Sequence, residues 1–279
     1  MAFDLNNFVI DRVVRGIAVS QGDNVKLGIS AGDVLFSINQ ITNPSLSCTS
    51  ESTDAVDALN VPIATFYRAK NAEFSAENAL FDMNLMATQA GTTKKIASAA
   101  AKIETPCFQT IDITTETSYT LSHTPKATPK VYVLNGDGTL GAKVEISSTA
   151  SGMAIALAGT TVTIVSGDGI ASGYAEGNQL FFMYDYDADG SEGNGAVEVA
   201  NTATNFPVGC KFIMEILGAD VCDQTNLIYA YLIFPNAKLS PDFDWSIATD
   251  STHPFSMRAM QELSFTYIVS KSLLSSRVA

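Results

Sequence analysis

The sequence is poor in basic residues. It has 16 Lys and Arg against 29 Asp and Glu, which gives a formal net charge of −13. A protein that binds nucleic acid on its own needs clustered Lys and Arg to neutralise the phosphates. No basic residue lies between Lys26 and Arg68 or between Lys143 and Lys211, although both stretches contain several carboxylates. The balance excludes a free-standing nucleic-acid binder and suits a surface that repels DNA.

Residues that commonly carry catalysis or bind metals are also scarce. The two histidines, His123 and His253, each lie next to or near a proline in loop-like sequence, so no His-based triad is indicated. The four cysteines are scattered without a C-x-x-C pair, which argues against a zinc site and is typical of free thiols in a reducing compartment. We expect no catalytic residues and no cofactor. A carboxylate-based hydrolase is the enzyme alternative that the sequence leaves open.

Long apolar runs are absent as well. No segment approaches 18 uninterrupted apolar residues, and the N-terminus lacks a basic start followed by an apolar run, so we expect neither a membrane span nor a signal peptide. Hydrophobic residues make up 46% of the chain and charged residues only 16%, which is typical of a folded protein with a core. At 279 residues the chain can form one large or two modest domains.

Most of the sequence has the residue patterns of β-strands and turns. Apolar runs that alternate or are bounded by turn residues predict strands at 33–41, 62–70, 130–134, 179–184, 208–217 and 227–234. Asn135-Gly136-Asp137-Gly138 supplies the positive φ angles of a tight hairpin. The acidic stretch from Glu51 to Asp57 is predicted to be a loop. The patterns predict a mainly β protein with an additional β-rich, sandwich-like middle region.

One stretch, from Ser75 to Gly91, has helical periodicity. Its apolar residues recur with three-four spacing, at positions 76, 79, 80, 83, 86, 87 and 90. Ser75 is an N-cap candidate, Glu77 suits the positive end of the helix dipole, and Gly91 permits the left-handed residue that ends a helix. We therefore predict one flanking α-helix over about residues 75–90.

An acidic segment resembles the opening of a calcium-binding loop. Asp185-Tyr186-Asp187-Ala188-Asp189-Gly190 has the alternate carboxylates and the Gly turn that wrap the ion in such loops. The twelfth position should be a bidentate Glu, but Ala196 stands there. Asp185, Asp187 and Asp189 are thus candidate calcium ligands, and a solvated acidic turn is the alternative reading that needs no ion.

Three stretches together resemble the tail tube (major tail) proteins of long-tailed bacteriophages, which are related to pyocin and type VI secretion inner tubes. They are the strand pair from Leu35 to Thr49, the segment from Ile63 to Gly91, and the late strands from Tyr229 to Leu239 with Phe243-Asp244-Trp245 and 253–257. The likeness covers about half of the chain. It implies a tube-forming β-barrel or sandwich with a helix at residues 1–105 and 200–279, and an inserted β region at 106–199.

The resemblance implies a structural virion protein of the phage tail, made and assembled in the cytoplasm of the bacterial host. Its copies would form hexameric rings that stack into a tube for genome ejection, in contact with tail sheath, terminator or baseplate proteins. DNA would pass without specific binding through an acidic lumen, for which Glu51, Asp54 and Asp57 are the candidate lining residues. The alternative is a capsid decoration protein or a host-binding β-sandwich protein of a virion.

Overall fold

The computed structural model describes residues 7–114, 118–147, 154–164, 178–221, 223–242, 244–245, 248–260 and 265–269. The chain divides into two compact units, of which the first is Met1–Lys94 with Val199–Ala279 and the second is Lys95–Glu198. The sequence predicts the boundaries after residues 105 and 199. The first boundary comes earlier in the structure, after Lys94, because the strand at Lys95–Ile96 already pairs with the strand at Val197–Glu198 of the second unit.

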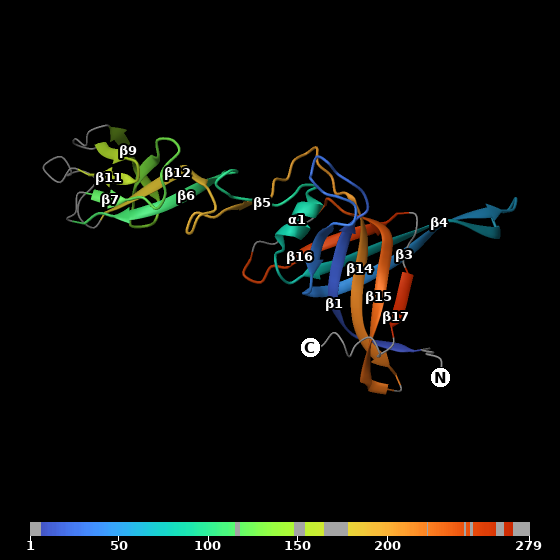
Figure 1. The fold of residues 1–279 in the computed structure, drawn as a ribbon. Coiled ribbons are helices and arrows are strands. Elements are labelled where there is room, and N and C mark those ends of the chain that lie inside the picture. Colours follow the sequence, from blue (N-terminus) through green and yellow to red (C-terminus); the bar gives the residue numbers. More distant parts are fainter. Residues whose placement is uncertain are drawn as a thin grey trace. The chain divides into compact units, whose positions relative to one another are not determined.

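The first unit is built on a curled β-sheet (Figure 1). Its described strands follow the order β2-β1-β14-β15-β16-β4-β3, and β17 pairs with β15 beside this path. All of these pairs are antiparallel, as is common for a sheet with one core-facing side. The strands are β1 (Phe8–Ser20), β2 (Val34–Ile38), β3 (Ile41–Val56), β4 (Pro62–Asn78), β14 (Gly209–Asp220), β15 (Asp223–Leu239), β16 (His253–Ala259) and β17 (Phe265–Val269).

A cluster of buried phenylalanines lies at the centre of the core of this unit. The ring of Phe74 has its centroid 5.6 Å from that of Phe212, 5.9 Å from that of Phe234 and 6.1 Å from that of Phe255. Phe36 extends the cluster on β2. Tilted aromatic pairs at such distances add to the stabilisation from buried area, so this cluster joins strands that are distant in sequence.

The α-helix among the described residues, α1, is shorter than predicted and spans Met83–Gln89. Residues 75–78 instead complete strand β4, where Phe74 and Ala76 are buried and pair with Met257 and Phe255 of β16. The alternation of a strand thus outweighs the helical spacing in this segment. The prediction that the helix begins at Ser75 is wrong, whereas the mainly β fold with one flanking helix is confirmed.

Asp82, not Ser75, caps the helix. Its carboxylate accepts hydrogen bonds from the backbone N–H groups of Asn84 at 2.9 Å and Leu85 at 2.7 Å. After the helix, Gly91 has a φ of 64°, and a Cβ added there would lie 2.4 Å from backbone atoms of Phe206. The predicted role of Gly91 at the end of the helix is confirmed, because both the angle and the close approach require glycine.

A buried histidine connects the helix to the sheet. His253 Nε2 lies 2.7 Å from Gln89 Oε1, and Gln89 Nε2 donates to the carbonyl of Pro254 at 3.2 Å. Both side chains are fully buried. Since the amide oxygen accepts, the neutral imidazole donates from Nε2, and Nδ1 has no hydrogen-bond partner among the described residues. Burial lowers the pKa of His253, and the nearby carboxylate of Asp82 offsets part of this effect.

We expect the first unit to lose stability as the pH falls from 7.5 to 5.5. An unfolded histidine has a pKa of about 6.5, whereas the pKa of folded His253 is lower. The unfolded state therefore binds the proton first, and stability decreases from about pH 6.5 downward until the folded pKa is passed. Urea unfolding followed by the fluorescence of Trp245 measures this change, because this single tryptophan lies 5.5 Å from the His253 ring.

Two glutamine variants control this prediction. His253→Gln should flatten the pH dependence of the urea midpoint between pH 7.5 and 5.5, because the titrating ring is gone. His123→Gln removes the other histidine of the chain, which lies in the second unit, and should leave the slope unchanged. An unchanged slope in His253→Gln would show that another group is responsible.

The second unit has its own sheet and its own core. Its described strands run in the order β6-β12-β8-β9-β10-β11-β7, around buried residues that include Ile111, Val131, Leu180 and Phe182. A separate two-stranded ribbon pairs β5 with β13. The strands are β5 (Lys95–Ile96), β6 (Ile103–Asp112), β7 (Ser118–Thr120), β8 (Lys130–Leu134), β9 (Leu140–Ser147), β10 (Ala154–Ala158), β11 (Thr161–Thr163), β12 (Gln179–Ala188) and β13 (Val197–Glu198).

Candidate assembly surface

The hairpin of β3 and β4 runs well beyond the sheet of the first unit (Figure 1). Strand β16 pairs with β4 only between Glu73 and Asn78. Further out, the two strands pair only with each other among the residues that the structure describes, and we call residues 49–71 the hairpin arm. Both outer edges of the arm therefore present unpaired backbone groups, which are templates for pairing with another chain. A two-stranded hairpin is marginally stable in water, so a partner would stabilise the arm.

Large apolar side chains are exposed along the arm. Leu59 is 82% exposed at its turn, while Ile63, Phe66 and Tyr67 of β4 are 70%, 59% and 73% exposed. Because side chains alternate along a strand, the neighbouring residues Phe66 and Tyr67 face opposite sides of the arm. Exposed apolar groups clustered in this way are typical of a contact surface for another protein. The arm thus has the character of an interface on both of its faces.

The three carboxylates predicted to line a lumen all lie on the arm. Glu51 and Asp54 are in strand β3, so the prediction of a loop from residue 51 to 57 is wrong up to Val56. Asp54 accepts a hydrogen bond from the hydroxyl of Thr65 at 2.7 Å. Asp57 forms the turn, since its Oδ1 accepts from the N–H groups of residues 59 and 61 at 2.8 and 2.9 Å. A single chain defines no lumen, and the lining role stays a prediction.

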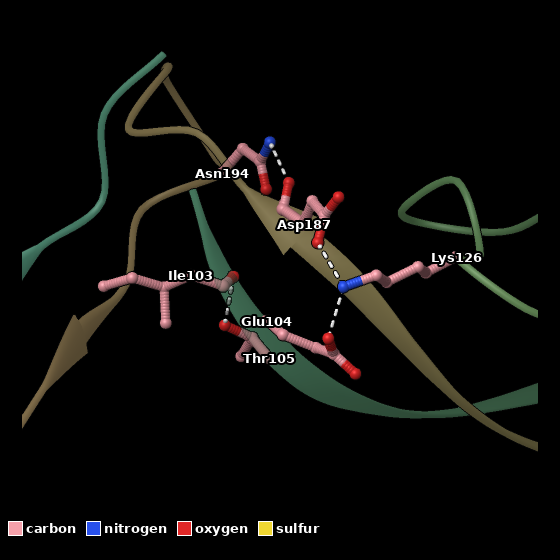
Figure 2. Close-up of polar contacts among 6 residues, drawn as sticks. All are labelled: Ile103, Glu104, Thr105, Lys126, Asp187 and Asn194. Atoms are coloured by element: carbon pink, nitrogen blue, oxygen red, sulfur yellow. Dashed lines mark hydrogen bonds and ion pairs between the residues drawn. The ribbon is translucent and has the colours of Figure 1, made fainter. Parts of the chain in front are cut away.

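The candidate calcium ligands lie in the second unit and point to different partners. Asp185 and Asp187 belong to the extended strand β12. Figure 2 shows Lys126 between Glu104 and Asp187; its Nζ lies 3.3 Å from Asp187 Oδ1 and also binds the carboxylate of Glu104. Hydrogen bonds to Glu104 and then Asp187 raise the pKa of Lys126. The lysine therefore bridges two carboxylates that face each other across β6 and β12 and offsets part of their repulsion.

Asp189 follows the strand and forms a tight turn. Its Oδ1 accepts from the N–H of Ser191 at 3.1 Å, from the Ser191 hydroxyl at 2.6 Å and from Asn194 Nδ2 at 2.8 Å. These hydrogen bonds, led by that of the Ser191 hydroxyl, lower the pKa of Asp189. No group of three or more His, Cys, Asp or Glu within the described ranges is arranged to hold a metal. The turn is explained without an ion, and calcium binding stays a prediction.

Two short matches to catalytic motifs also have structural explanations. Residues 28–32 fit the G-x-S-x-G pattern of serine hydrolases, and residues 136–141 fit the G-x-G-x-x-G pattern of dinucleotide sites. Both patterns function only where a strand passes directly into a helix. Here the first precedes strand β2, and the second forms the hairpin turn between β8 and β9. Neither motif therefore has the context that its chemistry needs.

The fold is mainly β, and it carries a hairpin arm whose exposed apolar side chains suit contact with another protein chain. The profile of the YomU/Tube protein family matches residues 27–263. The chain belongs to this family, which is a family of phage tail tube proteins and not of enzymes. The resemblance inferred from the sequence is thereby confirmed. No curated protein matches the chain.

Within the part of the chain that the structure describes, no helix is long and apolar enough to cross a membrane.

Proposed function

We propose that the protein forms rings, six copies to a ring, that stack into the tail tube through which the phage genome is ejected. The observation that carries this proposal is the hairpin arm, with its open edges and its exposed apolar side chains on both faces. A contact between an arm and a different surface of the next copy is heterologous, and such contacts build closed rings or propagating filaments from one kind of chain.

The charge of the protein supports a conduit for DNA. With a net charge of −13, an inner wall made of many copies repels the phosphate backbone, so that DNA slides without being bound. At its ends and on its outer surface such a tube meets terminator, baseplate or sheath proteins of the virion tail. Assembly takes place in the cytoplasm of the bacterial host.

Polymerisation of the purified protein tests this proposal. We expect particles that sediment far faster than a monomer and that appear in negative-stain electron micrographs as rings with sixfold symmetry or as hollow tubes. Their formation should depend on concentration, with a critical value below which only small species remain. A protein that stays monomeric at millimolar concentration and binds a surface glycan would instead support the host-binding alternative.

A further inference from the structure

The outer face of the sheet in the second unit carries a patch of aromatic side chains. Alternate residues of β6, β12 and β8 pack into the core of this unit, so the residues between them point away from it. Phe108 of β6 is 64% exposed, and its ring lies nearly parallel to that of Phe181 of β12, at 11° with the centroids 6.1 Å apart. Tyr132 of β8 is the direct cross-strand partner of Phe181. We call Phe108, Phe181 and Tyr132 the aromatic platform.

Hydrogen-bonding side chains border the aromatic platform. Thr110 of β6 and Lys143 of β9 are exposed, and each is the cross-strand partner of a platform residue. Further along the same face, Gln179 Nε2 donates to Asp112 Oδ1 at 2.6 Å. Donors and acceptors thus surround a flat apolar surface. A sugar ring has the matching chemistry, because its C–H groups suit the negative face of an aromatic ring and its hydroxyl groups project from the rim.

The size of the aromatic platform favours a small ligand over a protein partner. Phe108 is 64% exposed, whereas Phe181 and Tyr132 are half-buried. Since an aromatic side chain has about 150–250 Å² of surface, the exposed aromatic area is roughly 300 Å² at most. A stable protein interface needs about 800 Å² from each partner. A short run of sugar rings is enough to cover the platform.

The charge of the second unit determines the kind of polymer that can approach it. Residues 95–198 contain 5 Lys, no Arg and 12 Asp and Glu, which gives a net charge of −7. This charge repels anionic polymers, such as polymers of uronic acids or of sugar phosphates. A neutral polysaccharide meets no such repulsion. The sign of the charge therefore favours a neutral ligand.

We propose that the aromatic platform of the second unit binds a neutral polysaccharide. Its sugar rings lie on Phe108 and Phe181, and its hydroxyl groups form hydrogen bonds with the side chains at the border. This inference goes beyond the proposed function and does not depend on it, because the platform belongs to the second unit and the hairpin arm to the first. In an assembly of many copies, weak binding at each platform adds up to firm attachment to a surface that carries the polymer.

Retention of the full-length protein on polysaccharide-coated beads tests this inference. The neutral probes are dextran, levan and mannan, and the anionic probes are alginate and polygalacturonate. We expect retention on at least one neutral polymer, with little dependence on salt because the contact is not ionic, and none on the anionic polymers. Phe108→Thr should raise the half-saturating protein concentration about tenfold or more, because the most exposed ring of the platform is lost.

Two further variants control this experiment. Phe108→Tyr keeps an aromatic ring in place and should bind like the parent. Ile96→Thr removes an apolar side chain of similar exposure, 62%, from strand β5 of the same unit, outside the platform, and should also bind like the parent.

Three results would each overturn the inference: retention on none of the neutral polymers, retention on the anionic polymers alone, or equal retention of Phe108→Thr and the parent. Smaller particles of Phe108→Thr in sedimentation, without retention of the parent on any bead, would overturn it in favour of a protein partner at the platform. Loss of polysaccharide binding leaves the proposed function untouched, because polymerisation of the parent is measured without any polymer present.

Discussion

Shortening the hairpin arm should abolish assembly and leave the folding of the chain almost unchanged. The variant replaces residues 51–69 by Asn-Gly, which forms a tight turn between Ser50 and Lys70, two directly paired residues. The removed segment contributes none of the residues of the aromatic core. We expect the free energy of unfolding of the first unit to change by no more than about 1 kcal/mol, the usual size of surface changes.

The loss of assembly can be separated into the effects of length and of apolar surface. A full-length variant with Ile63→Thr, Phe66→Thr and Tyr67→Thr keeps the strand propensity of the arm but removes its large apolar groups. Burial of each large side chain is worth about 1.5–3 kcal/mol, so the critical concentration should rise by about 100-fold or more for the three together. Sedimentation velocity over a concentration series measures this value for each variant.

Val25→Thr is the matched control, because Val25 is 94% exposed and lies outside the arm. Its critical concentration should equal that of the parent. If the shortened chain still forms tubes at the parent's concentration, the arm is not the assembly surface, and the contacts between copies must lie elsewhere on the molecule.

The sequence predicted the β character of the chain but misplaced the boundary between strand and helix. Residues 75–78 satisfy both a helical spacing and a strand alternation, and local pattern alone does not choose between them. The choice is made by pairing with β16, more than 170 residues later in the chain, which places Phe74 and Ala76 in the core. Contacts of such long range have no local signal. The end of the helix at Gly91 was predictable because it depends on the conformation of a single residue.

The hairpin arm as a whole was harder to predict than its individual strands. The apolar residues of 62–70 predict a strand, but the acidic and small residues of its partner from Glu51 to Val56 favour a loop. Alternation of apolar and polar residues arises where one face of a strand packs on a core. A strand that does not pack on the core of its own chain needs no such alternation. The exposed Phe66 and Tyr67 beside an acidic segment were the available signal, because a soluble monomer gains nothing from exposing them.

The cross-strand pair of Lys238 and Arg258 could not be predicted from the sequence. Lys238 and Arg258 are separated by 20 positions, and only the pairing of β15 with β16 places them opposite each other. By contrast, the turn at Asp189 was visible as a local pattern of carboxylates and glycine. Its side chains use that pattern for hydrogen bonds within the turn. A local motif is thus easy to find in the sequence, but the sequence explains its role poorly. A surface assembled from distant strands is hard to find in the sequence, but its role is easier to explain once the structure is known.

Replacement of Phe74 by alanine should be the most destabilising single change in the first unit. Phe74 is 1% exposed and its ring contacts those of Phe212, Phe234 and Phe255. Truncation of a buried phenylalanine to alanine costs about 3–5 kcal/mol, because transfer energy is lost and a cavity remains. Phe74 also lies next to Glu73, which is the last residue of β4 that pairs with β16 before the arm begins. The loss should therefore loosen the attachment of the arm as well as the core.

The second unit supplies a matched variant for this prediction. Phe182→Ala removes a fully buried ring from the separate core of that unit and should cost a similar free energy there. Urea unfolding monitored by Trp245, which lies in the first unit, should shift to lower urea for Phe74→Ala and stay in place for Phe182→Ala. A shift of equal size in both variants would mean that the two units unfold as one. Then the separate cores would not correspond to separate folding units, and the looser attachment of the arm expected in Phe74→Ala could not be assigned to the strand pairing at Glu73.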